Sequence, residues 1–149
     1  GYSLGSMFVY ELACHLTDRF AAVASYAGTM PTNPASCEQT NPISILHVHG
    51  KQDAIIAYDH EWDWKDWDSV GTMRDIPGLI DFWAKKYDCA TLKDTVTAKV
   101  QHVEHSACDG NSRIELLGLD GQDHTWPQTI NGLSMHLVLW NFLRGFKLD

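Results

Sequence analysis

The sequence predicts an α/β fold in which helices cover both faces of a mainly parallel sheet. Segments with apolar residues at helical spacing alternate along the chain with short, continuous apolar or β-branched runs that end near glycine. The 149 residues are 44% hydrophobic and 20% charged, which suffices for one globular core and gives no sign of disorder. We therefore expect one domain, or part of one, whose strands lie between layers of helix.

Three segments have the period of a helix. Residues 7–16 repeat apolar side chains at this spacing without Gly or Pro, so we expect a helix that starts just behind Ser3. Residues 76–87 place most of their apolar side chains on one side. Residues 132–146 are a third, strongly apolar helix.

The predicted strands are residues 20–26, 43–49 and 113–119, and residues 95–104 alternate between polar and apolar side chains. Residues 29–42 form a loop by their Pro, Asn and Ser content. The acidic stretch 58–70 contains Trp62, Trp64 and Trp67 and predicts no regular element. These tryptophans could stack on a sugar or an aromatic acid, although packing within the loop is the more common use of such residues.

The first five residues form a G-x-S-x-G motif, which is typical of the nucleophile elbow of α/β-hydrolases. In this turn a serine is held between a strand and a helix so that its hydroxyl is exposed, and the flanking glycines avoid steric collisions. Ser3 is therefore a candidate nucleophile. The backbone N–H of Leu4, at the start of the following helix, is a candidate donor to an oxyanion hole.

Asp53 and His124 complete a candidate catalytic triad with Ser3. Each lies in a loop directly after a predicted strand, and the order nucleophile, acid, histidine is that of α/β-hydrolases. Loops that leave the carboxyl ends of parallel strands meet at one edge of the sheet, so the three side chains can converge. Asp120 and Asp123 are competing acids, but they precede His124 too closely to reach its ring from another strand.

The pair His47 and His49 lies on one face of a predicted strand, and with Asp53, Asp59 and His60 it could be interpreted as a metal cluster. Buried strand histidines are more often satisfied by core hydrogen bonds. We therefore predict no metal site and no cofactor.

The four cysteines lack the paired spacing of a zinc site, which favours disulfides. Cys89 and Cys108 bracket a segment with turn-like ends, so a bridge between them would close a loop or a strand excursion. Cys14 is either a buried free thiol or a partner of Cys37. Either bridge would indicate an oxidising compartment.

The net charge of −8 argues against nucleic acid as a partner, because its phosphates would be repelled. No apolar run approaches the length of a membrane span, so we expect no membrane partner either.

Several segments resemble the polyhydroxybutyrate-depolymerase-like esterases, the family that also holds secreted feruloyl and acetylxylan esterases. The most specific are the H-x-H-G-x-x-D of residues 47–53 and the His-Thr-Trp-Pro of residues 124–127, and the other matches are residues 1–7, 18–24 and 83–89. Ser6 stands where the family commonly has glycine, residues 122–123 replace a glycine-rich approach to the histidine, and the Trp-rich stretch differs from a shorter family loop.

The resemblance implies a secreted or periplasmic serine esterase with an α/β-hydrolase fold. It assigns Ser3 as nucleophile, Asp53 as acid and His124 as base, and the pair of residues 89 and 108 matches a usual disulfide position. Its substrates would be polyhydroxyalkanoate, feruloyl or acetyl-xylan esters. We take Tyr2 and Trp126 as candidate substrate-binding residues.

An elbow needs a strand on its N-terminal side to hold the turn, and none precedes Ser3 in this sequence. We therefore expect residues 1–149 to be the C-terminal portion of a single α/β-hydrolase domain, with its first strands and oxyanion loop lying upstream. The alternative from another functional class is a carbohydrate-binding or scaffold module that uses the Trp cluster and performs no catalysis.

Overall fold

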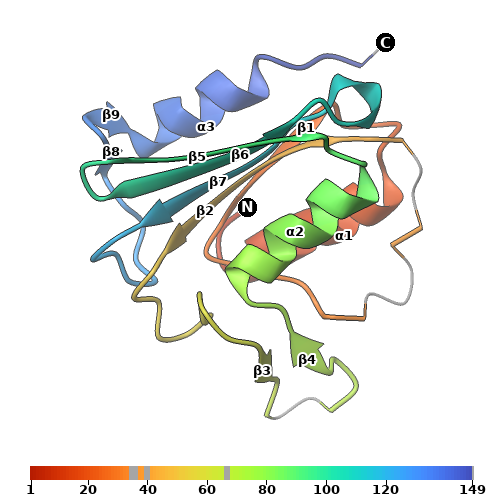
Figure 1. Cartoon of the computed structure of the whole chain (residues 1–149). Coiled ribbons are helices and arrows are strands. Elements are labelled where there is room, and N and C mark those ends of the chain that lie inside the picture. Colours follow the sequence, from red (N-terminus) through yellow and green to blue (C-terminus); the bar gives the residue numbers. More distant parts are fainter. Residues whose placement is uncertain (34–36, 39–40, 66–67, 149) are drawn as a thin grey trace.

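The computed structural model describes residues 1–33, 37–38, 41–65 and 68–148. It is a mixed α/β structure with a five-stranded sheet, two small two-stranded sheets and three α-helices (Figure 1). In chain order, the elements are α1 (Leu4–His15), β1 (Ala22–Tyr26), β2 (Ser44–Gly50), β3 (Trp62–Asp63), β4 (Thr72–Met73), α2 (Ile76–Lys86), β5 (Thr91–Thr97), β6 (Val100–Ser106), a short 3₁₀ turn (Asp109–Asn111), β7 (Ile114–Leu119), β8 (Thr129–Ile130), β9 (Leu133–Ser134) and α3 (Met135–Leu143).

The main sheet has the strand order β1-β2-β7-β6-β5. Strands β1, β2 and β7 are parallel, whereas β6 runs antiparallel to both β7 and β5. The prediction of a mainly parallel sheet therefore holds only for the first three strands. It fails beyond β7 because β5 and β6 are a hairpin joined by Ala98 and Lys99, and a two-residue turn can connect only antiparallel neighbours.

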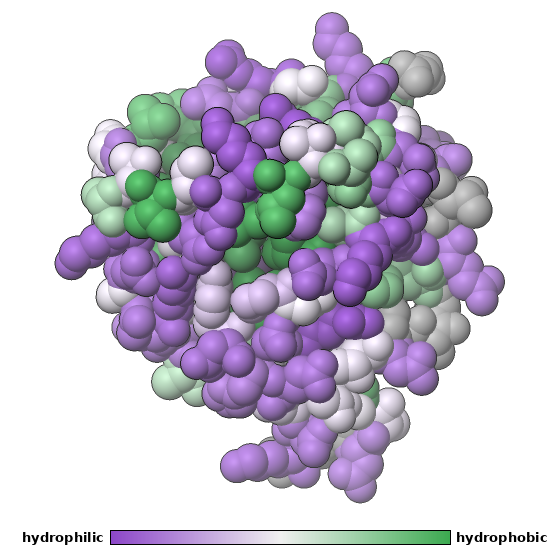
Figure 2. All heavy atoms as spheres, viewed as in Figure 1, coloured by the Kyte–Doolittle hydropathy of each residue, from purple (hydrophilic) through white to green (hydrophobic). Residues whose placement is uncertain are grey.

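Helices cover both faces of this sheet, as the sequence predicts. On one face lie α1 and α2 (Figure 1). Their Tyr10 and Trp83 are buried in one cluster with Ile45 and Ile114 of the central strands. On the other face, α3 packs against β1, β2 and β7. Figure 2 shows the molecule in the same view as a mostly hydrophilic surface, with hydrophobic residues near its middle and at its upper left.

Local signals explain where α2 and α3 begin. Asp75 caps α2 by accepting a hydrogen bond from the Gly78 N–H, and Pro77 occupies a first-turn position where its missing N–H costs nothing. Ser134 caps α3 in the same way through the Leu137 N–H. The helix predicted for residues 132–146 therefore starts later, because residues 133–134 pair with β8.

The remaining predicted elements occupy nearly the predicted residues. The strands expected at 20–26, 43–49 and 113–119 are β1, β2 and β7, and the helix expected at 76–87 is α2. In the Trp-rich stretch, Trp62 lies in β3 and contacts Trp64, with 5.3 Å between ring centroids. Trp67 lies outside the described residues.

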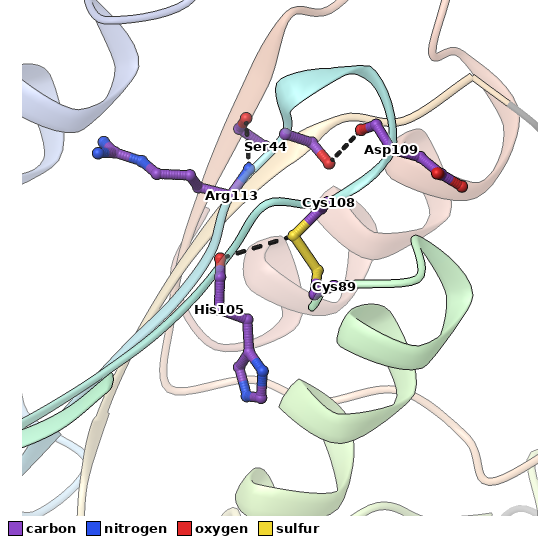
Figure 3. The surroundings of a disulfide bond; sticks show 7 residues. Ser44, Cys89, His105, Cys108, Asp109 and Arg113 are labelled. Atoms are coloured by element: carbon purple, nitrogen blue, oxygen red, sulfur yellow. Dashed lines mark hydrogen bonds between the residues drawn. A yellow bond between two sulfur atoms is a disulfide. The ribbon is translucent and has the colours of Figure 1, made fainter. Parts of the chain in front are cut away.

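Both cysteine pairs form disulfides, Cys14–Cys37 and Cys89–Cys108. The second bridge joins the segment after α2 to the segment after β6, close to the start of β7 (Figure 3). Cys14 is therefore not a free buried thiol. In the part of the chain that the structure describes, no helix has the length and apolar character needed to cross a membrane.

Candidate active site

Ser3 occupies a sharp turn at the start of α1. Its φ of 54° lies in the left-handed region, which a residue with a side chain adopts only when the surrounding structure enforces it. The enforcing contacts come from β1: the Ser3 N–H donates to the Tyr26 carbonyl at 2.9 Å, and the Tyr26 N–H donates to the Gly1 carbonyl at 2.9 Å. Tyr2 forms a parallel bridge with Tyr26, so the chain enters the turn alongside β1.

The two glycines of the motif have different reasons to be glycine. A Cβ on Gly1 would overlap the carbonyl of Gly5, so the first glycine is required for the turn to close. A Cβ on Gly5 would meet no atom of the described residues within 4 Å. The collision that the motif predicts on both sides of Ser3 therefore occurs only on its N-terminal side.

The loop after β7 carries His124 to the same edge of the sheet. Gly50, at the end of β2, allows this approach, because a Cβ there would overlap the carbonyl oxygens of Gln122 and Asp123. The Tyr26 hydroxyl donates to the Thr125 carbonyl at 2.6 Å and fixes the far side of the loop.

Ser3, His124 and Asp53 are brought together in one hydrogen-bonded row. The Ser3 Oγ lies 2.9 Å from His124 Nε2, and His124 Nδ1 lies 2.7 Å from the Asp53 Oδ2. A serine at the first position of a helix often caps the helix with its side chain, but the Ser3 side chain makes no such bond. Its hydroxyl is directed to the imidazole instead.

Asp53 is held by its own loop as well as by His124. The Ile55 and Ile56 N–H groups both donate to Asp53 Oδ1 at 2.8 Å, and His49 Nε2 lies 3.3 Å from Oδ2. Burial by itself would raise the pKa of the Asp53 carboxyl, but hydrogen bonds from His49, the Ile56 N–H, His124 and the Ile55 N–H together hold it well below its usual range. The carboxylate is therefore ionised although its side chain is fully buried.

The competing acids have other partners. Asp120 forms an ion pair with Lys51 at 3.1 Å. The Asp123 Oδ1 accepts from the Thr125 N–H at 2.9 Å and closes a local turn. Of these three acids, Asp53 is the one that contacts the His124 ring.

The Leu4 N–H, proposed as an oxyanion donor, belongs to the first turn of α1. The N–H groups of Gly5, Ser6 and Met7 donate to carbonyls of Tyr2 and Ser3. Among the described residues, no backbone carbonyl accepts from the Leu4 N–H. A free N–H beside Ser3, at the positive end of a helix, has the properties that an oxyanion donor needs.

Tyr2 and Trp126, the candidate substrate-binding residues, lie beside the triad in an aromatic cluster. The Tyr2 hydroxyl donates to the His124 carbonyl at 2.6 Å, and its ring stacks on Tyr26 with 5.5 Å between centroids. Trp126 contacts both tyrosine rings edge to face. Tyr2 is 41% exposed, so part of this cluster is open to a ligand while its buried part supports the His124 loop.

An apolar groove of about 300 Å³ begins next to the triad at Leu4. Its lining includes Phe8 of α1 together with Trp64 and Met73 from the segment of β3 and β4. Both Leu4 and Phe8 are largely exposed.

His47 and His49 form no metal cluster with Asp59 and His60, which contact each other on the surface. The two strand histidines are fully buried and hydrogen-bonded to each other, to Tyr10 and to the Ile56 carbonyl. Both rings thus make the core hydrogen bonds that are expected of buried strand histidines. What the sequence does not reveal is that these bonds lead to Asp53.

Among the described residues, one group brings three possible metal ligands within 4.8 Å of one another, namely His102, Glu104 and Glu115. Glu115 already pairs with His102 at 2.9 Å and with Arg113 at 3.1 Å. Both oxygens of the Glu115 carboxylate therefore already have a partner, His102 for one and Arg113 for the other.

Two curated proteins resemble the chain, whereas no protein-family model matches it. NocK of Nocardia uniformis subsp. tsuyamanensis, which is named as an esterase, is 41% identical over 59 residues, covering 40% of this chain and 17% of that protein. The bifunctional acetylxylan esterase/xylanase XynS20E of Neocallimastix patriciarum is 24% identical over 156 residues, covering 100% of this chain and 20% of that protein. The chain thus spans at most about a fifth of the length of these relatives, and the name of each includes esterase activity.

Proposed function

We propose that this chain carries the catalytic triad of a serine esterase with an α/β-hydrolase fold. The proposal rests chiefly on one observation: Ser3, at positive φ on a strand-to-helix turn, is hydrogen-bonded to His124, which is hydrogen-bonded to the buried carboxylate of Asp53. The esterase names of two similar proteins support the reaction class.

In the proposed reaction, the Ser3 Oγ attacks the ester carbonyl while His124 Nε2 takes the hydroxyl proton. The carbonyl oxygen becomes an oxyanion that the Leu4 N–H stabilises. When the tetrahedral intermediate collapses, the alkoxide leaves with the proton from His124, and the acyl group stays on Ser3. Water then attacks the acyl carbonyl while His124 Nε2 takes a proton from it. When the second tetrahedral intermediate collapses, His124 returns this proton to the Ser3 Oγ and the carboxylic acid leaves.

Asp53 has two roles in this scheme. Its Oδ2 accepts the Nδ1–H of His124, so that Nε2 keeps the lone pair needed to take the serine proton. Its negative charge then stabilises the imidazolium that forms during attack.

The substrate class is a carboxylic ester of a polymer, of the polyhydroxyalkanoate, feruloyl or acetyl-xylan type. Acetylated xylan is the first to test, because the relative aligned over the whole chain is named for that activity. We expect the protein to act outside the cytosol, since its two disulfides require an oxidising compartment.

The direct test is turnover of p-nitrophenyl acetate by the full-length protein and its Ser3→Ala variant. Removal of the nucleophile should lower kcat on the order of 10⁶-fold, as in other serine hydrolases. Ser112→Ala is a matched control, because its hydroxyl donates to the Asp109 carbonyl at the opposite end of β7. It should keep normal turnover.

A fluorophosphonate probe separates this function from that of a carbohydrate-binding or scaffold module. An activated Ser3 should react quickly and carry the label, and Ser3→Ala should carry none. Full activity of the Ser3→Ala variant, or binding of xylan by a protein that the probe does not label, would refute the serine esterase assignment.

A further inference from the structure

A row of buried hydrogen bonds leads from α1 through β2 to Asp53. The Tyr10 hydroxyl lies 2.5 Å from His47 Nδ1, and His47 Nε2 lies 3.0 Å from His49 Nδ1. His49 Nε2 lies 3.0 Å from the Ile56 carbonyl and 3.3 Å from Asp53 Oδ2. The side chains of Tyr10, His47 and His49, together called the relay below, are completely buried.

The position of each proton in the relay follows from its end at Asp53. The Ile56 carbonyl and the Asp53 carboxylate can only accept, so the His49 Nε2 that faces both must carry a proton. In a neutral ring the Nδ1 of His49 is then an acceptor, and His47 Nε2 must donate to it.

The same reasoning fixes the other end of the relay. Burial, followed by the neighbouring His49 ring, lowers the pKa of His47 far below its usual value, so His47 is neutral. Its Nδ1 is therefore an acceptor, which takes the hydrogen bond of the Tyr10 hydroxyl at 2.5 Å, and the Ser25 Oγ lies 3.1 Å from the same nitrogen.

We propose that Tyr10, His47 and His49 are positioning residues that hold the Asp53 carboxylate through a series of Nε2–H tautomers. This inference rests on the proposed esterase function, in which Asp53 orients His124. The relay supplies Oδ2 of Asp53 with a second N–H donor besides His124 and fixes the Ile56 carbonyl. Since the Ile56 N–H donates to Oδ1, the relay restrains both carboxylate oxygens.

Loss of the relay should impair the chemistry more than the binding of substrate. Without the His49 donor, the Asp53 carboxylate keeps its three other donors, but its Oδ2 is then restrained by His124 alone. The imidazole orientation matters only when Ser3 transfers its proton. We therefore expect kcat to fall while KM stays close to that of the wild type.

The tautomers can be measured without any turnover. In the full-length protein labelled with ¹⁵N-histidine, two-bond ¹H–¹⁵N correlations distinguish Nδ1–H, Nε2–H and charged rings. Spectra of His47 and His49 variants assign the signals. Both rings should be neutral Nε2–H tautomers, and an Nδ1–H or a charged ring at His49 would overturn the relay.

Kinetics of three variants test the positioning role. His49→Leu removes the donor and should lower kcat between about tenfold and a hundredfold, the range for one hydrogen bond to a charged group. His49→Gln presents an amide N–H near the position of Nε2 and should recover most of this loss. Val48→Ala is the matched control: it lies on the same strand, is completely buried and faces the opposite side of the sheet. It should lose stability but keep kcat.

The outcomes separate this inference from the proposed function. An inactive wild type that no fluorophosphonate labels refutes the esterase, while the tautomer spectra still decide the proton positions. An active wild type whose kcat is unchanged in folded His49→Leu refutes the positioning role alone. Equal kcat losses in His49→Leu and Val48→Ala would show that the effect is structural.

Discussion

At the scale of single residues, Asp53 combines complete burial with ionisation. Burial in a protein interior normally favours the neutral carboxyl, so several donors must compensate for lost water. Here the donors are His49, the Ile56 N–H, His124 and the Ile55 N–H, which together hold the pKa of Asp53 well below its usual range. The same contacts that orient the triad therefore link the stability of the fold to pH.

The sign of this link is fixed by the direction of the pKa change. Because the pKa of Asp53 is lower in the folded than in the unfolded chain, its contribution is complete above the unfolded value of about 4 and is lost as pH falls below it. The free energy of unfolding of the wild type should exceed that of Asp53→Asn by a constant amount between about pH 5 and 7, and this difference should shrink below about pH 4. Urea unfolding of both proteins between pH 2 and 7 measures it. A difference that grows on acidification would contradict the assignment.

At the scale of secondary-structure elements, charged side chains support the pairing of β6 with β7. His102 on β6 lies 2.9 Å from Glu115 on β7, and Arg113 contacts the other oxygen of the same carboxylate. The hydrogen bond to Glu115 raises the pKa of His102 against the effect of burial, the charges of Glu115 and Glu104 raise it further, and Lys93 lowers it.

This raised pKa predicts a pH dependence opposite to that of Asp53. The stabilisation by protonated His102 is complete below its unfolded pKa of about 6.5 and is lost as pH rises through the higher folded value. Wild type should therefore be more stable relative to His102→Gln at pH 5.5 than at pH 8.5. Thermal melts at both pH values, repeated in high salt to screen this partly exposed pair, measure the effect. An equal difference at both pH values would mean that His102 does not titrate against Glu115.

The elements that the sequence did not predict are those without local signals. Ala98 adopts a φ of 54° in the two-residue turn between β5 and β6, a conformation for which hairpins normally use Gly, Asn or Asp. The chain has Ala and Lys there, so residues 95–104 look like one alternating segment rather than parts of two strands. The strands of the β3–β4 pair are two residues long, which is too short for any periodic pattern.

The triad and the relay differ in predictability for a related reason. Ser3, Asp53 and His124 lie in short sequence motifs at the ends of strands, so a pattern of spacing and order finds them. The bond from Tyr10 to His47 joins α1 to β2 across 37 residues and depends on how the helix packs. Sequence alone predicts that His47 and His49 share a strand face, but not which side chain meets them there.

At the scale of the whole molecule, the two disulfides lie away from the triad. Cys14 is near the end of α1, whereas Ser3 is at its beginning. Cys89–Cys108 lies before the start of β7 (Figure 3), and His124 comes after the end of this strand in the chain. Cys14 lies near the end of α1 and Cys89 follows α2, so each bridge joins the end of a helix to another part of the chain. Both therefore support the scaffold rather than the proposed triad.

Removing either disulfide should therefore lower stability without changing the chemistry. The bridges join residues 23 and 19 positions apart. Loops of about 20 residues correspond to about 3 kcal/mol of stabilisation by the chain-entropy estimate, and the logarithmic dependence on loop length makes the two contributions nearly equal.

Two double variants test this, Cys14→Ala/Cys37→Ala and Cys89→Ala/Cys108→Ala. In urea unfolding, each should lose about 3 kcal/mol of unfolding free energy. At a temperature where both remain folded, each should keep the wild-type kcat. Mass mapping of a non-reduced digest identifies the two pairs directly. A drop in kcat of the folded variants would mean that a disulfide positions the triad, and unchanged unfolding midpoints would mean that the bridges do not constrain the unfolded chain.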